Sequence, residues 1–259
     1  DIFYQDMDVY ESQKRLDDLV EDICCFIQAT RFQLHIHSTC RGLLYDVNSC
    51  SVRKFYFHFA FFGRKGTTIP HDISEIKNVT STARFILIIE KDATFQQIVN
   101  SDFAKKHSAL LVTGKGFPDS NTRQIVRIFW EFLRIPIFVL VDADSYGIEI
   151  LCVYRYGSLG KSYNAINLVN PQIRWLGVHP TDLNGHIISK TTIMSDADIK
   201  KIQDLLNRPY IKSNPIWREQ VQHLLNLKAK AEIQILTNYS SQYLINEYIP
   251  NKIKNGNWL

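Results

Sequence analysis

An apolar run at residues 135–141 stops abruptly at two acids, Asp142 and Asp144, which one alanine separates. The run is rich in β-branched and aromatic residues and has no polar face, which predicts a strand buried on both sides, as in a parallel sheet. Residues two apart in a strand share a face, so both carboxylates should project together from its carboxyl end. Gly147 then permits a tight turn, and a short helix should follow and end at Gly157.

Two further apolar runs, at residues 84–89 and 109–112, predict two more strands ahead of this one. The first ends in Glu90, and the second ends in a Gly-Lys-Gly turn at 114–116. The intervening segments have helical patterns, and the second of these helices should begin at the capping residue Asp119. Such alternation favours an α/β fold with parallel strands whose carboxyl ends meet at one edge, where open sheets bind ligands.

Three carboxylates, those of Glu90, Asp142 and Asp144, should therefore converge at this edge. Carboxylates this close repel one another unless a cation lies between them, and a set of oxygen ligands suits Mg²⁺ or Mn²⁺. Lys115, from the Gly-Lys-Gly turn, would add a contact for phosphate. The alternative interpretation is an acidic loop edge that holds no ligand.

The same Asp-Ala-Asp tripeptide occurs again at residues 196–198. There it follows Ser195 and precedes the apolar spacing of an amphipathic helix. Asp196 and Asp198 are therefore interpreted as acids of the first helical turn, where the helix dipole favours them. We expect these two residues to play no part in the metal site.

The region before the α/β alternation has a different pattern. From Glu11 onward, apolar residues at helical spacing predict a helix, and residues 53–61 alternate like a half-buried strand of a hairpin. A helix followed by strands with interspersed Arg and Lys is consistent with a winged-helix DNA-binding module. We place this module at residues 1–65, with the domain boundary in the polar stretch 63–81 and the second domain at 66–259. The predicted apolar face of the helix consists of Leu16, Leu19, Val20, Ile23 and Ile27.

Composition narrows the class of protein. A chain of 259 residues suffices for one large or two modest domains, and 45% hydrophobic with 22% charged residues is typical of a globular protein. A net charge of +4 permits a polyanionic partner without requiring one. No apolar run is long enough to span a membrane, and no signal peptide is recognised. Five cysteines without paired spacing favour a reducing compartment.

Several segments together resemble the Toprim domain: Glu90 after a strand, residues 113–119 (TGKGFPD) with Thr122-Arg123, and Asp142-x-Asp144-x-x-Gly147. More closely, the chain resembles the meiotic double-strand-break transesterase family, which is homologous to the A subunit of topoisomerase VI. The resemblance covers essentially the whole chain. Further matching segments are 90–95, 173–177, 208–210, 230–234 and 244–259.

The resemblance implies a nucleophile that composition alone does not single out. Residues 1–4, DIFY, are similar to the family segment whose last tyrosine attacks DNA, so Tyr4 is the implied catalytic residue. A rival alignment places Tyr56 there, but it loses the matches at 11–13 and 34–36. Ser145 stands where the family usually has proline. We expect the helices and the active-site arginine that precede this motif in the family to lie outside this chain.

By resemblance, the Tyr4 oxygen would attack a DNA phosphodiester and form a 5′-phosphotyrosyl link, with Mg²⁺ held by the three acids. This type IIB topoisomerase-like reaction would initiate meiotic recombination in the nucleus. The implied partners are double-stranded DNA, a second copy of the chain and a topoisomerase VI B-like subunit, with no membrane. The alternatives are a topoisomerase VI A subunit that reseals DNA in ATP-dependent strand passage, and a non-catalytic DNA-binding scaffold. The residues implied to contact DNA or phosphate are Lys91, Lys115, Phe117, Arg123 and Arg174.

Overall fold

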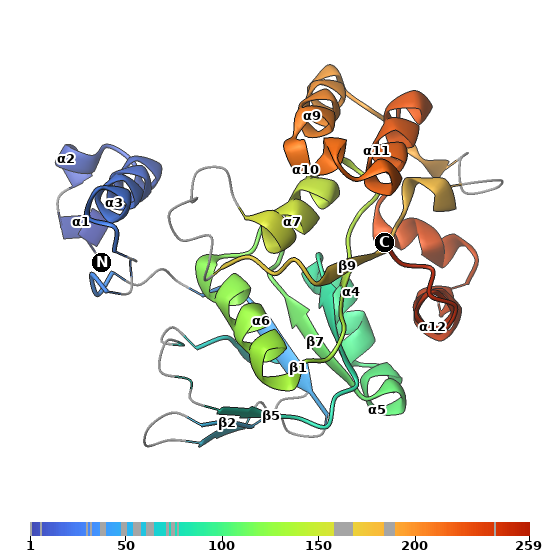
Figure 1. The fold of residues 1–259 in the computed structure, drawn as a ribbon, viewed down its shortest axis with the longest axis horizontal. Coiled ribbons are helices and arrows are strands. Elements are labelled where there is room, and N and C mark those ends of the chain that lie inside the picture. The colour runs from blue at the N-terminus through green and yellow to red at the C-terminus, as the bar shows by residue number, and fades with distance from the viewer. Residues whose placement is uncertain are drawn as a thin grey trace.

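A mainly parallel six-stranded sheet, with helices on both faces, forms the centre of the computed structural model (Figure 1). This architecture confirms the predicted α/β fold class. None of the described helices is both long and apolar enough to cross a membrane. The structure describes residues 2–5, 7–29, 31, 33–36, 40–47, 51–53, 58–60, 65–70, 73, 76, 78–157, 168–183, 190–240 and 242–259.

Four parallel strands, in the order β7-β6-β8-β9, make up most of the sheet. The first three of these are the strands that the apolar runs predict. β1 and then β4 extend the sheet beyond β7 in antiparallel pairing. Because β1 precedes the stretch 63–81, the central sheet contains residues from both sides of the predicted domain boundary, which stays a prediction. The strands are β1 Leu43–Asp46, β4 Thr67–Thr68, β6 Phe85–Ile89, β7 Ala109–Thr113, β8 Ile137–Leu140 and β9 Ile173–Gly177.

The parallel strands are apolar throughout because both of their faces are covered. In β6, Ile86 and Ile88 belong to the core on the side of α6 and α7, whereas Phe85, Leu87 and Ile89 belong to the core on the side of α4 and α5. All five residues are buried. The covering helices are α4 Asp92–Val99, α5 Phe103–His107, α6 Ser120–Leu133 and α7 Ser145–Tyr156.

The helix α6 begins and the helix α7 ends where the sequence indicates, but α7 already begins at Ser145, before Gly147. The Asp119 side chain accepts a hydrogen bond from the Thr122 backbone N–H at 2.7 Å and thereby caps α6. Gly157 follows the last residue of α7. The Asp119 cap fixes where α6 begins, and so it positions the loop that follows β7 at the carboxyl edge of the sheet.

The C-terminal third packs around the same sheet. The backbone N–H of Leu259 donates to the Trp175 carbonyl at 2.9 Å, so the end of the chain lies along β9. Two short strands, β10 Thr192–Ile193 and β11 Ala229–Lys230, pair with each other. The helices here are α9 Asp196–Asn207, α10 Pro209–Lys212, α11 Pro215–Leu227 and α12 Ile249–Lys254, with short 3-10 helices η2 Pro180–Asp182 and η4 Ile233–Asn238 and a π-helical turn, η5 Leu244–Tyr248.

The N-terminal helices form a small group at one side of the molecule, outside the helices that cover the sheet (Figure 1). They are α1 Ile2–Gln5, α2 Met7–Tyr10 and α3 Gln13–Ile27.

The predicted apolar face of α3 is only partly correct. Leu16 and Val20 are buried with Cys24, but Leu19, Ile23 and Ile27 are 42%, 51% and 47% exposed. The helix packs on a small cluster through one narrow stripe at four-residue spacing, so the rest of the predicted face remains at the surface.

A hairpin follows these helices, as predicted, but residues 53–61 are not one strand, because Arg53 and His58 pair with each other. Strands β2 Ser51–Arg53 and β3 His58–Ala60 pair antiparallel, and β5 Asn78–Thr80 pairs with β2 on its other side. Residues 54–57, which include Tyr56, lie outside the described residues. The winged-helix assignment stays a prediction.

Candidate active site

The carboxyl ends of β6 and β8 bring Glu90 and Asp142 into direct contact. Oε2 of Glu90 accepts a hydrogen bond from the backbone N–H of Asp142 at 2.8 Å, and both residues are buried. Burial, together with the neighbouring negative charge of Asp142, raises the pKa of Glu90 to about 8. The two acids therefore meet at one sheet edge, as the strand pattern predicts, while their role as metal ligands stays a prediction.

Asp144 lies in the turn that leads from β8 into α7. Its Oδ1 accepts the Gly147 backbone N–H at 2.7 Å, so Asp144 is the N-cap of α7. Burial raises its pKa, against the effect of the N–H groups of Gly147 and Tyr146. The sequence pattern predicts both aspartates on one strand face, but β8 ends at Leu140. The two carboxylates thus reach the edge through a capped turn rather than through strand alternation.

The backbone of Asp142 lies so close to position 147 that only glycine fits there. A Cβ at this position would lie 2.3 Å from the Asp142 carbonyl oxygen, far inside van der Waals contact. The turn from Asp142 into α7 can therefore be this tight only with glycine.

A segment distant in sequence, residues 229–234, holds Asp142 from another side. The backbone of Ala231 pairs with that of Ala143 through hydrogen bonds of 2.8 and 3.1 Å. The Ile233 backbone N–H donates to Oδ1 of Asp142 at 2.7 Å. The sequence alone indicates this segment only as a family match and predicts no role for it at the site.

The cation nearest to Asp142 is Lys91. Its Nζ lies 2.9 Å from Oδ2 of Asp142 and 2.8 Å from Oε2 of Glu232, and it donates to Gln234 at 3.3 Å. Although burial opposes the charge, these two carboxylates raise the pKa of Lys91. Lys91 is thus engaged by acids of its own chain, and its predicted contact with DNA stays a prediction.

The second Asp-Ala-Asp tripeptide starts a helix, as predicted, and one of its acids lies near the site. The expected cap is present, because Ser195 and Asp198 form a reciprocal capping box at the start of α9. However, Asp198 is buried beside the site: it contacts the Ser145 hydroxyl at 3.4 Å and Lys230 Nζ at 2.8 Å. Burial opposes ionisation, but Lys230 and Ser195 lower the pKa of Asp198 to about 2. The negative charge of Asp198 acts on Asp144, so Asp198 lies beside the acids, and its expected absence from metal binding stays a prediction.

The Gly-Lys-Gly turn lies against the same edge. The Gly116 backbone N–H donates to the Glu90 carbonyl at 2.9 Å, which fixes the turn beside the acids. Lys115 is a partly exposed surface residue whose Nζ lies 3.5 Å from Asp92.

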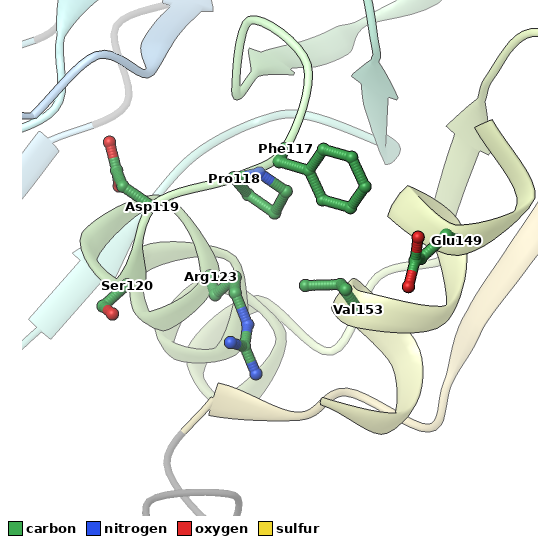
Figure 2. Close-up of a pocket in the computed structure, with 7 residues that line it drawn as sticks. All are labelled: Phe117, Pro118, Asp119, Ser120, Arg123, Glu149 and Val153. Atoms are coloured by element: carbon green, nitrogen blue, oxygen red, sulfur yellow. The ribbon is translucent and has the colours of Figure 1, made fainter. Parts of the chain in front are cut away.

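Beyond this turn, Arg123 lines a cavity of about 350 Å³ between α6 and α7, together with Phe117 and Val153 (Figure 2). Phe117 is 40% exposed, but Arg123 is buried. Within the described part of the chain, neither Nε nor Nη2 of its guanidinium has a hydrogen-bond partner. Burial lowers the pKa of Arg123 to about 10. A buried guanidinium with unused donors is suited to receive an anion.

Two predicted residues lie elsewhere. Tyr4 is in α1 and is 69% exposed, and its ring packs on Phe3. Arg174 is in β9, where its guanidinium lies 3.9 Å from the ring centroid of Trp258. The structure therefore brings together Glu90, Asp142, Asp144, Lys91 and the Gly-Lys-Gly turn, with Phe117 and Arg123 on the loop and helix that follow, but not Tyr4 or Arg174.

Residues 85–253 match the family model for the Toprim domain of Spo11 and of the topoisomerase 6 A subunit, and residues 1–36 match "Type IIB DNA topoisomerase". The chain belongs to the family of Spo11 and the topoisomerase 6 A subunit. The meiotic recombination protein SPO11 of Homo sapiens is 39% identical over 268 residues, which cover 100% of this chain and 66% of the relative. The A subunit of DNA topoisomerase 6 of Arabidopsis thaliana is 34% identical over 261 residues, which cover 100% of this chain and 61% of the relative. The chain thus spans two thirds or less of the length of these relatives.

The acids of this member of the family fit a divalent cation in their chemistry. Glu90, Asp142 and Asp144 supply only oxygen donors, and burial raises the pKa of each. A bound cation would offset the repulsion that contributes to these shifts. Across the ranges that the structure describes, no three His, Cys, Asp or Glu side chains are arranged as a ready metal cage.

Proposed function

We propose that this chain makes meiotic DNA double-strand breaks by topoisomerase-like transesterification, with Tyr4 as the nucleophile. The observation that carries the proposal is the meeting of Glu90 and Asp142, with Asp144 in the adjoining turn, at the carboxyl edge of the sheet in a member of this family. The human and mouse relatives named for meiotic recombination, both 39% identical, support this function over strand passage.

In this reaction, the Tyr4 oxygen attacks a phosphodiester phosphorus. A bond forms between the tyrosine oxygen and phosphorus while the bond from phosphorus to the 3′ oxygen breaks, which leaves a 5′-phosphotyrosyl protein. The phenol loses its proton, and the departing 3′ oxygen takes up a proton to give the free 3′-OH. Mg²⁺ or Mn²⁺ held by Glu90, Asp142 and Asp144 would supply charge neutralisation on the phosphate and on the departing oxygen. A phenol with an ordinary pKa of about 10 is a weak nucleophile at neutral pH. The exposure of Tyr4 supports access to DNA.

The phosphate contacts that the geometry supports best come from the loop after β7 and from the helix α6 that follows it. Lys115 is partly exposed beside Glu90, Phe117 offers an exposed ring, and Arg123 has unused guanidinium donors at the cavity of Figure 2. For Lys91 and Arg174, a role in DNA binding rests on the resemblance to the family.

We also propose that two copies of the chain act together, with Tyr4 of one copy meeting the acids of the other. The position of α1 outside the helices that cover the sheet supports an exchange between copies (Figure 1). Two such composite sites would cut the two strands of one duplex. A nuclear location and a topoisomerase VI B-like partner complete the proposal.

The test is whether the protein becomes covalently attached to DNA 5′ ends, measured with the assembled complex. Tyr4→Phe should abolish attachment while leaving folding and DNA binding nearly intact, because the change removes a single hydroxyl. The matched control is Tyr56→Phe, which should still attach. Persistent attachment in Tyr4→Phe, with loss in Tyr56→Phe, would show that the nucleophile is the other tyrosine.

A second candidate is the A subunit of a DNA-resealing topoisomerase. The Arabidopsis and Aeropyrum pernix relatives named as topoisomerase 6 subunits, 34% and 32% identical over nearly all of this chain, favour it. The two functions differ in the fate of the break: ATP-dependent relaxation of supercoiled DNA by the complex would support resealing. Absence of any attachment with every divalent metal tried would instead leave a DNA-binding scaffold.

A further inference from the structure

The ammonium of Lys91 occupies a position at Asp142 that a metal ion would also need. Oδ1 of Asp142 accepts the Ile233 N–H at 2.7 Å, and Oδ2 lies 2.9 Å from Lys91 Nζ. Both carboxylate oxygens are therefore engaged, and the side chain is buried. A divalent ion that approaches Asp142 meets a positive charge already in contact with the ligand oxygen.

Lys91 has a second set of partners to which it can move. Glu232 lies 2.8 Å from its Nζ and Gln234 accepts from it at 3.3 Å, both from the 229–234 segment. The Glu232 side chain is 70% exposed, whereas that of Asp142 is 5% exposed. Lys91 can thus release the buried oxygen of Asp142 and keep an ion pair with a carboxylate nearer to solvent.

We propose that Lys91 is an internal counter-ion of the acidic edge, which a divalent cation displaces from Asp142 and which Glu232 and Gln234 then retain. The proposal rests on the metal site of the proposed function. Without metal, Lys91 compensates the buried charge of Asp142 and stabilises the fold. When metal binds, two cations at one carboxylate oxygen would repel each other, so Lys91 has to move away from Asp142. The free energy that this movement costs makes metal binding less favourable. Lys91 therefore lowers the metal affinity and sets the concentration at which the site fills.

The experiment is titration calorimetry of the full chain with MnCl₂, without DNA and at about physiological salt. Lys91→Met should bind Mn²⁺ about tenfold more tightly than wild type, which corresponds to about 1.4 kcal/mol. Its melting temperature without metal should fall, because Asp142 loses its counter-ion. Glu232→Gln should bind about threefold more weakly, because Lys91 then has only Asp142 as an ionic partner.

The double variant separates displacement from simple electrostatics. If Glu232 acts through Lys91, adding Glu232→Gln to Lys91→Met should change the affinity by less than about 1.5-fold, a clear departure from additivity. A purely electrostatic effect would instead lower the affinity by the same factor in both backgrounds. Lys115→Met is the charge-matched control: it removes a lysine of the same edge that pairs with Asp92, and it should change the affinity by less than about twofold.

If wild type and Lys91→Met both bind Mn²⁺ with equal affinity, the displacement proposal is wrong, while the metal site of the proposed function stands. Additive effects of the two substitutions would overturn the displacement as well. If neither protein binds Mn²⁺, the metal site of the proposed function fails too. Should Lys91→Met not fold, Glu232→Gln carries the test, since its exposed side chain can be changed without disturbing the core, and an unchanged affinity there would refute the displacement.

Discussion

Glu90 should make the stability of the metal-free protein fall as pH rises. It is buried next to Asp142, and these two causes raise its pKa from 4.5 to about 8. A folded-state pKa above the unfolded value means that the folded chain binds more protons between these two pH values. The free energy of unfolding therefore decreases as pH rises through this window, and the destabilisation is complete above about pH 8.

The magnitude follows from the size of the shift. At about 1.36 kcal/mol per pKa unit, the whole shift corresponds to an upper limit of about 5 kcal/mol. Relaxation and water penetration reduce such penalties in real proteins. We therefore expect about 2 kcal/mol of stability to be lost between about pH 5.5 and about pH 8.

Urea denaturation with a chelator present, at these two pH values, measures the effect. Glu90→Gln keeps an oxygen that can accept the Asp142 N–H but cannot ionise, so its stability should lack this loss. The comparison of wild type with Glu90→Gln also removes the contribution of His179. Burial and the charge of Lys252 lower the pKa of His179 to about 4, so its effect on the pH dependence of stability has the opposite sign. Glu149→Gln is the control. Burial opposes ionisation of Glu149, but Lys201 and Arg208 lower its pKa. The contribution of Glu149 to the free energy of unfolding therefore changes only below about pH 4.5, outside the window.

Mg²⁺ provides a second readout of the same charge. A cation bound by the acids would favour ionised Glu90, so saturating Mg²⁺ should flatten the wild-type profile between the two pH values. Equal losses of stability in wild type and Glu90→Gln across this window would refute the role of Glu90. A profile of opposite slope, after the Glu90→Gln values are subtracted, would refute it as well.

Two further substitutions test individual residues. Asp144→Asn removes a charge but keeps a good N-cap, so its melting temperature without metal should be at least that of wild type. This variant should not be stabilised by Mg²⁺ and should not cleave DNA. Asp144→Ala also removes the cap, so its free energy of unfolding should fall by about 1 kcal/mol. Cleavage by Asp144→Asn would remove it from the metal site. Arg123→Gln should weaken DNA binding and reduce its dependence on salt by about one phosphate contact. The free energy of unfolding should stay equal or rise by about 1 kcal/mol, because the Nε and Nη2 donors of the buried guanidinium, which are unpaired among the described residues, are costly. An unchanged salt dependence would exclude Arg123 from phosphate binding.

The central strands could be predicted from sequence because burial on both faces leaves an unbroken apolar run. This signal is local, and it identified β6, β7 and β8 within one or two residues. The strand β1 gave no such signal. It has four residues with an alternating burial pattern, and its partner β7 lies more than sixty residues away in the chain. Nothing in a short half-buried segment specifies which sheet it joins.

The acids of the site were found by the same logic, since they follow directly on apolar strands. What surrounds them was not found, because the contacts are made by residues far apart in sequence. The hydrogen bond from Ile233 to Asp142 joins residues 91 positions apart, and Lys91 reaches Gln234 across 143 positions. No spacing rule reports such contacts. The match of residues 230–234 to the family was the available signal, and its meaning depended on the fold.

The two Asp-Ala-Asp tripeptides illustrate the limit of local interpretation. Each contributes to a helix start, Asp144 as the N-cap of α7 and Asp198 in the capping box of α9, but the sequence predicted this role only for the second tripeptide. The fold then brings the two helix starts together, where the Ser145 hydroxyl contacts Asp198 and Lys230 pairs with it. The positive ends of two helix dipoles therefore lie at the acidic edge, in addition to Lys91 and Lys230. This compensation explains how the chain can fold with several buried carboxylates before any metal binds. If the proposed metal site is correct, removal of the metal should therefore stop DNA cleavage without unfolding the protein.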